Sequence, residues 1–191
     1  MITTPPPFWK TCRVIACETR LRLLWSLFAL KEQCVSELME TTGTSRPNTS
    51  NQLRMLAEHG LLIYRRESMN VFYRAEPNAA MTFAPPLLNA LQNAYTHSMG
   101  RKTVIRHATA LSHGRREEII RALKGNRLSF QQLQQKTGMS TSALSRHLHK
   151  LTSRSFVQHN NDQTYSYGKL GNLLGRTLIQ LAADPGYSMP Q

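Results

Sequence analysis

Two stretches of the sequence repeat one pattern of polar side chains with helical spacing. Residues 45–62 read SRPNTSNQLRMLAEHGLL, and residues 140–157 read STSALSRHLHKLTSRSFV. Each begins with a serine suited to cap a helix and continues with hydroxyl, amide and guanidinium groups. Such groups donate hydrogen bonds to phosphates and to the edges of guanine and adenine, and the scarcity of carboxylates avoids repelling them. The chemistry of both stretches therefore suits DNA.

Leucine spacing divides each of these helices into two faces. In the first helix Thr49, Leu53 and Leu56 should face the core, with Pro47 in the first turn and Gly60 at the end. In the second, Leu144, Leu148 and Leu151 take the inner positions. We expect DNA contacts from the remaining polar residues and the caps, namely Ser45, Arg46, Asn48, Ser50, Asn51, Arg54, Ser140, Thr141, Ser142, Ser145, Arg146 and His149.

A β-hairpin is expected after each polar helix. The first has arms at residues 64–66 and 71–74, with Arg65, Arg66 and Arg74 as candidate phosphate contacts. The second lies within residues 156–169, where Asn160, Asn161 and Lys169 take the corresponding positions. The second hairpin should therefore hold phosphates more weakly, with Lys169 as its candidate contact.

The repeat extends beyond the polar helices. Shifting the sequence by 95 residues without a gap matches Arg20 with Arg115, Gly43 with Gly138 and Ser50 with Ser145. It predicts two tandem domains, copy 1 at residues 8–98 and copy 2 at residues 99–184. In copy 1 helices around residues 19–28 and 35–39 precede the polar helix, and in copy 2 residues 111–123 and 130–139 do so.

This order of helices and hairpin predicts a mainly α fold with small β-hairpin wings, a tandem duplicated winged helix-turn-helix. Residues 77–100 contain no Asp, Glu, Lys or Arg, and helices are expected at residues 85–95 and 172–184. An uncharged helix is better buried than solvated. We therefore expect the two copies to pack on each other as an intrachain pseudo-dimer, with a homodimer as the alternative.

Composition supports a polyanionic partner. The net charge is +13; residues 1–100 carry 10 Lys/Arg and 7 Asp/Glu, and residues 101–191 carry 14 and 4. The N-terminus lacks the pattern of a signal peptide, and no apolar run approaches a membrane span, so we expect a cytoplasmic protein that does not bind membranes. No catalytic order, phosphate loop or cofactor motif is present. An enzyme and a cofactor are not expected.

The segments ETRLRLL, EQCVSELM and TSRPNTSNQLRMLAEHGLLIYRR of copy 1 resemble the ArsR/SmtB family of winged-helix regulators, as do ALSHGRREEIIRAL and MSTSALSRHLHKL of copy 2. The resemblance implies a dimer packed through its first and last helices. It also implies repression at a palindromic operator until a ligand, often a metal ion, releases the DNA.

This chain departs from the family in carrying both winged helices in one polypeptide and in its cysteines. Many members have two cysteines flanking one residue, whereas here Cys34 is followed by Val35 and Ser36. A thiol site would need Cys12 and Cys17 as well. Three small buried apolar side chains are the favoured interpretation, so no metal site is expected.

We therefore predict a sequence-specific double-stranded DNA-binding transcriptional repressor. Its two unequal recognition helices would read an imperfect palindrome with half-sites about one helical turn apart. The alternative is a winged-helix interaction or architectural module that binds DNA without specificity. The operator, the direction of regulation and an effector are left open.

Overall fold

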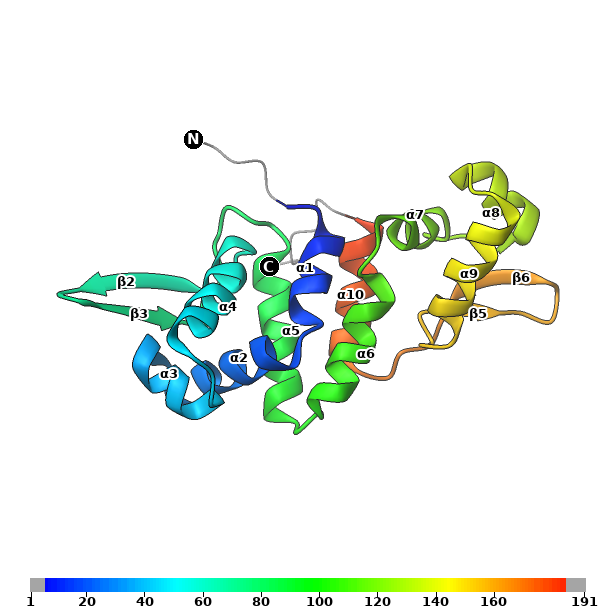
Figure 1. Cartoon of the computed structure of the whole chain (residues 1–191). Helices are drawn as coiled ribbons and strands as arrows, with labels where there is room; N and C mark the ends of the chain where they lie inside the picture. Colours follow the sequence, from blue (N-terminus) through cyan, green and yellow to red (C-terminus); the bar gives the residue numbers. More distant parts are fainter. Residues whose placement is uncertain (1–5, 185–191) are drawn as a thin grey trace.

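The computed structural model describes residues 6–184, which form two successive sets of helices, each with a small sheet (Figure 1). In copy 1 the elements are α1 (Phe8–Ile15), α2 (Glu18–Leu30), β1 (Glu32–Cys34), α3 (Val35–Thr42), α4 (Arg46–Glu58), β2 (Ile63–Glu67), β3 (Asn70–Arg74) and α5 (Ala84–Thr96). In copy 2 they are α6 (Arg101–Leu111), α7 (Gly114–Ala122), β4 (Leu128–Ser129), α8 (Phe130–Thr137), α9 (Thr141–Thr152), β5 (Val157–His159), β6 (Thr164–Tyr167) and α10 (Leu173–Ala183). The predicted mainly helical fold with hairpin wings is confirmed.

Each sheet has three antiparallel strands rather than the two of the predicted hairpin. The strand orders are β1-β3-β2 and β4-β6-β5, and Tyr64 lies opposite Tyr73 in the first hairpin. The additional strands, β1 and β4, have three and two residues and lead directly into α3 and α8. Strands this short carry no alternation that sequence reasoning could detect.

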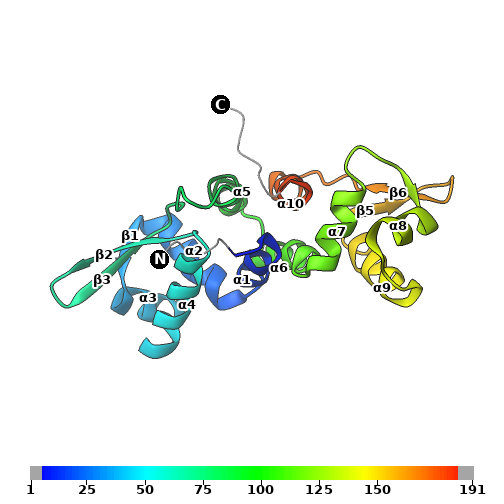
Figure 2. The same ribbon diagram turned by 90° about the horizontal axis from the view of Figure 1, so that it is seen from above.

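Two helices from each copy pack together at the centre of the molecule. The first helices α1 and α6 lie against each other, and so do the last helices α5 and α10 (Figures 1 and 2). The core is continuous across this boundary, because Cys12, Ile15, Leu91, Ala108 and Leu178 are fully buried in one cluster. The chain therefore forms within itself the interface that a dimer would form between two chains.

The structure corrects the gapless alignment of the two copies. Around α1–α2 and α6–α7 the offset is 96 residues, because Leu21, Leu23, Leu24 and Leu27 are buried as Glu117, Ile119, Ile120 and Leu123 are. From the helix caps Cys34 and Ser129 through the recognition helices α4 and α9, whose caps are Ser45 and Ser140, the offset is 95. Copy 2 is thus one residue shorter between α7 and α8.

The partner of Arg20 is accordingly Arg116 and not Arg115. Nε of Arg20 donates to the Val14 carbonyl at 2.5 Å, and Nε of Arg116 donates to the Ala110 carbonyl at 2.6 Å. Each arginine thus binds carbonyl groups at the end of the helix that precedes its own. The helix predicted within residues 111–123 begins later than expected, because Ser112 and His113 lie between α6 and α7.

Two local expectations at α4 have different outcomes. Ser45 occupies the N-cap position of α4, but its side chain makes no capping hydrogen bond, so the prediction that Ser45 caps this helix is wrong. In copy 2 the Ser140 hydroxyl does accept a capping hydrogen bond from the Ala143 N–H, at 3.4 Å. Thr49 is fully buried, as predicted. None of the helices among residues 6–184 is long and apolar enough to cross a membrane.

Candidate nucleic-acid interface

The helix α4 presents its polar face to solvent and its apolar face to the core. Thr49, Leu53 and Leu56 are buried, whereas Asn51 and Arg54 are exposed. The other candidate side chains that are exposed are those of Ser45, Arg46 and Asn48, whereas Ser50 is half-buried. The predicted division of faces is present, and DNA contact by these residues stays a prediction.

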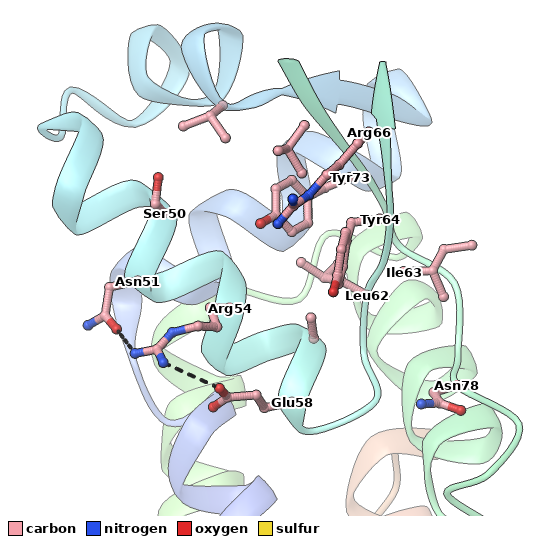
Figure 3. Close-up of a pocket in the computed structure, with 13 residues that line it drawn as sticks. Ser50, Asn51, Arg54, Glu58, Leu62, Ile63, Tyr64, Arg66, Tyr73 and Asn78 are labelled. Atoms are coloured by element: carbon pink, nitrogen blue, oxygen red, sulfur yellow. Dashed lines mark hydrogen bonds and ion pairs between the residues drawn. The ribbon is translucent and has the colours of Figure 1, made fainter. Parts of the chain in front are cut away.

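Hydrogen bonds hold the two arginines of α4 against polar neighbours in the described structure. Arg54 donates to the Asn51 amide oxygen at 3.0 Å and lies 3.6 Å from the Glu58 carboxylate (Figure 3). Arg46 donates to the Ser36 hydroxyl of α3 at 3.1 Å. Neither arginine is buried, so both remain able to exchange these exposed partners for a phosphate or a base.

Two of the three wing arginines of copy 1 form ion pairs with acidic residues. Arg65 forms ion pairs with Glu32, at 2.8 Å, and with Glu67, and Arg74 approaches Glu32 at 3.6 Å and Glu76 at 3.3 Å. The hydrogen bond from Arg65 lowers the pKa of the Glu32 carboxyl group, which keeps it ionised. Within residues 6–184, Arg66 makes no ion pair. Arg66 is therefore the wing arginine whose charge is most available.

A groove of about 900 Å³ separates α4 from the wing. Ser50 and Arg54 line it from α4, Tyr64 and Arg66 from β2, and Tyr73 from β3 (Figure 3). Tyr64 is 59% exposed, whereas burial raises the pKa of the Tyr73 hydroxyl group. Donors thus flank an apolar floor, an arrangement that suits a sugar–phosphate strand passing between helix and hairpin.

In copy 2 the helix α9 has the same two faces, but its wing has different chemistry. Leu144, Leu148 and Leu151 are buried. The candidate residues are all exposed, namely Ser140, Thr141, Ser142, Ser145, Arg146 and His149. In the wing, Asn160 bonds to Thr164 and Ser166 and accepts a bond from Gln158 at 3.1 Å. Lys169 lies beyond the end of β6. The side chain of Asn160 thus forms hydrogen bonds within the wing.

Both polar helices lie on the same side of the molecule. Figure 2 shows α4 and α9 on the side away from α5 and α10, with α1 and α6 between them. Sequence reasoning predicted the two helices but gave no information on their relative placement.

The cysteines are not gathered into a site. Among residues 6–184, no group of three or more Cys, His, Asp or Glu side chains is arranged to hold a metal ion. Cys12 is fully buried, and burial raises the pKa of its thiol, whereas Cys17 and Cys34 are half-buried. The interpretation of three buried cysteines is therefore correct for Cys12 alone. Cys34 occupies the N-cap position of α3, where its N–H donates to Glu37 at 2.7 Å, as the N–H of Ser129 donates to Gln132 at 2.8 Å in copy 2. The donor set thus does not fit a thiol-bound ion, and Cys34 has a structural position.

The model of the bacterial regulatory protein arsR family matches this chain twice, at residues 17–64 and 113–158. This chain is an ArsR-type protein with two tandem copies. The two matches cover the helices and first hairpin strands around α4 and α9. The resemblance predicted from the sequence is thereby confirmed.

Curated relatives match this chain over a stretch shorter than one copy. The arsenic resistance transcriptional regulator ArsR2 of Pseudomonas putida is 38% identical over 74 residues, which are 39% of this chain and 62% of the relative. The arsenical resistance operon repressor of Escherichia coli K12 is 38% identical over 66 residues, 35% of this chain and 56% of the relative. This ArsR-type chain thus spans about 60% of the length of these relatives. No solved structure matches it.

Proposed function

We propose that this protein is a sequence-specific DNA-binding transcriptional repressor that binds as an intrachain pseudo-dimer. The observation that supports it best is the presence of α4 and α9 on one side of the molecule, with the packed helices between them (Figure 2). A dimer of helix-turn-helix domains places its two recognition helices in successive major grooves in this way. Repression is inferred from the Escherichia coli relative, which is named an operon repressor.

The two recognition helices should read different half-sites. Copy 1 offers Arg46, Asn51 and Arg54, whereas copy 2 offers Thr141, Arg146 and His149 at or near the corresponding positions. Arginine prefers guanine and asparagine prefers adenine, so the two faces favour different bases. The operator is therefore an imperfect palindrome with half-site centres about one helical turn apart.

The test is fluorescence anisotropy of the full chain on DNA upstream of its own gene and on a scrambled duplex of equal length, each over a salt series. We expect a preference of about a thousandfold or more that persists as salt rises. Equal affinities that collapse together with salt would overturn the proposal and favour an interaction or architectural module.

Paired variants separate the two copies in the same assay. Ser50→Ala with Arg54→Ala should weaken specific binding by roughly 1 to 3 kcal/mol for each hydrogen-bonded base that the variant no longer reads, and Ser145→Ala with Arg146→Ala should do so at the other half-site. A binding-site selection that returned a perfect palindrome would instead indicate a homodimer that uses one copy from each chain.

The effector of this repressor is a separate question. Two relatives are named for arsenic resistance, but the described residues bring no three thiols together. We therefore propose that DNA binding by this chain does not depend on a thiol-bound ion. Arsenite titrated into the protein–DNA complex should leave the anisotropy unchanged, and release of the DNA would contradict this proposal.

A further inference from the structure

Four basic residues lie on α1 of copy 1, on the start of α7 that it contacts, and on α9, which packs against α7. We call Lys10, Arg13, Arg115 and Arg146 the junction cluster, and all four side chains are exposed. Lys10 and Arg13 both lie over the Trp9 ring, at 5.7 and 5.2 Å from its centroid. The indole thus orders two long side chains that would otherwise be mobile.

Contacts across the boundary hold α1 against copy 2. The Trp9 indole lies beside Gly114, the first residue of α7, where an added Cβ would meet it at 3.4 Å. Burial first, and then the charges of Arg116, Arg13, Arg115 and Arg146, lower the pKa of His113, the cap of α7. The His113 ring in turn lies 4.7 Å from the ring of His147 on α9. The charges of three of the four cluster residues therefore act on one imidazole, that of the α7 cap.

The junction cluster also lies between the two recognition helices. On its other side, α1 contacts α4, and the Thr11 hydroxyl and Nδ1 of His59, the residue that ends α4, are 2.8 Å apart. The helix α1 thus reaches from the end of α4 to the start of α7, which in turn packs against α9. DNA that contacts α4 and α9 together must pass this helix (Figure 2).

Carboxylates neutralise little of this charge. Glu118 lies 2.8 Å from Arg115, and the buried Glu117 is directed to Arg121 at 3.5 Å. Within residues 6–184, Lys10, Arg13 and Arg146 form no ion pair. Most of the positive charge of the cluster is therefore available to an anionic ligand.

The corresponding place on the other side of the pseudo-dimer carries fewer of these basic residues. The counterparts of Arg13, Arg115 and Arg146 are Thr109, Thr19 and Asn51, all neutral. The counterpart of Lys10 is Arg106, whose guanidinium donates to the Ser153 carbonyl at 2.7 Å. The hairpins show the opposite imbalance, since the copy 1 hairpin carries Arg65, Arg66 and Arg74, whereas beside the copy 2 hairpin the arginine is Arg127, which precedes β4.

We propose that the α1 and α7 members of the junction cluster, Lys10, Arg13 and Arg115, bind backbone phosphates of the DNA between the two half-sites and so offset the weaker phosphate binding expected of the copy 2 wing. The inference rests on the proposed DNA binding. The ligand is a phosphodiester strand, which arginine and lysine bind by charge and hydrogen bonds without reading its sequence.

The test compares two double variants that remove equal charge. Lys10→Gln with Arg13→Gln alters the junction cluster, whereas Lys124→Gln with Arg176→Gln alters exposed residues near α10, on the side away from α4 and α9. Each full-length variant is titrated by anisotropy with the upstream DNA and the scrambled duplex over a salt series. Hydroxyl-radical footprinting maps the protected sugars, and thermal melting confirms that both variants are folded.

We expect the junction variant to lower the magnitude of the salt slope by about 2, close to 0.9 for each phosphate that it no longer neutralises. Protection should disappear between the half-sites and persist at the flanks, while the α10 variant should match the unaltered protein. Equal slopes for all three proteins, or central protection that survives in the junction variant, would overturn the inference. Failure of the proposed function is a different result, because the unaltered protein would then show no preference for the upstream DNA.

Discussion

Copy 1 and copy 2 build the turn before the recognition helix from different chemistry. In copy 1 a chain of hydroxyl groups crosses the turn, with Thr42 and Thr44 oxygens 2.9 Å apart and Thr44 and Thr49 oxygens 2.7 Å apart. In copy 2 the last two positions hold Met139 and Leu144, both buried. A buried hydroxyl needs a partner, so the two positions must be polar together or apolar together. One backbone therefore accepts either solution, provided that both positions change.

A mismatched substitution in copy 2 should have the largest effect on stability. Leu144→Thr removes apolar contacts and buries a hydroxyl beside Met139, which offers no oxygen, and should lower the free energy of unfolding by roughly 2 to 4 kcal/mol. Urea denaturation followed by circular dichroism measures this change. Met139→Thr combined with Leu144→Thr recreates the copy 1 chain and should be less destabilised than the sum of the two single variants. Simple additivity would show that the hydroxyl chain gives no coupling.

The buried carboxyl group of Glu117 in α7 should have the next largest effect on stability. Glu117 takes the position of Leu21 in copy 1, is 6% exposed, and has its pKa raised to about 7 by burial. The folded protein thus binds a proton that the unfolded chain releases near pH 4.5, so stability falls as pH rises from about 4.5 to above 7.

Glu117→Gln should therefore stabilise the protein at pH 8 by on the order of 1 to 3 kcal/mol and have little effect at pH 4.5. Thermal melting at a series of pH values measures the difference. A pH-independent effect of Glu117→Gln would contradict the raised pKa.

Leucine periodicity and the repeat were sufficient to predict the winged helix-turn-helix and the inner and outer faces of α4 and α9. The alignment of Arg20 with Arg115 failed because local identity outweighed the burial pattern, which requires the one-residue shift to Arg116. The Thr49 hydroxyl also lacked an explanation in sequence, because its partner Thr44 lies in the turn and not on the helix. The junction cluster joins α1 to α7 and α9, and only the packing of the two copies brings its residues together.

The adjacent wing arginines Arg65 and Arg66 of copy 1 differ in their acidic partners, and their contributions to DNA binding should differ accordingly. Arg66→Gln should lower the magnitude of the salt slope for DNA binding by about 0.9, the value of one phosphate contact. Arg65→Gln should lower it by less than half as much, because Arg65 is occupied by Glu32 and Glu67. Anisotropy over a salt series distinguishes the two variants. Equal decreases would show that DNA displaces the carboxylates from Arg65.

The smallest expected effect is a gain in the wing of copy 2. Asn161 is exposed in the turn of the second hairpin, whereas its neighbour Asn160 holds the hairpin together by hydrogen bonds. Asn161→Arg supplies a phosphate contact without breaking those bonds and should raise the affinity for the upstream DNA by roughly threefold at low salt. Asn161→Gln is the uncharged control. The gain should shrink on DNA truncated beyond the copy 2 half-site, because the added guanidinium then has no phosphate to reach. An equal gain on both duplexes would show instead that only the net charge had changed.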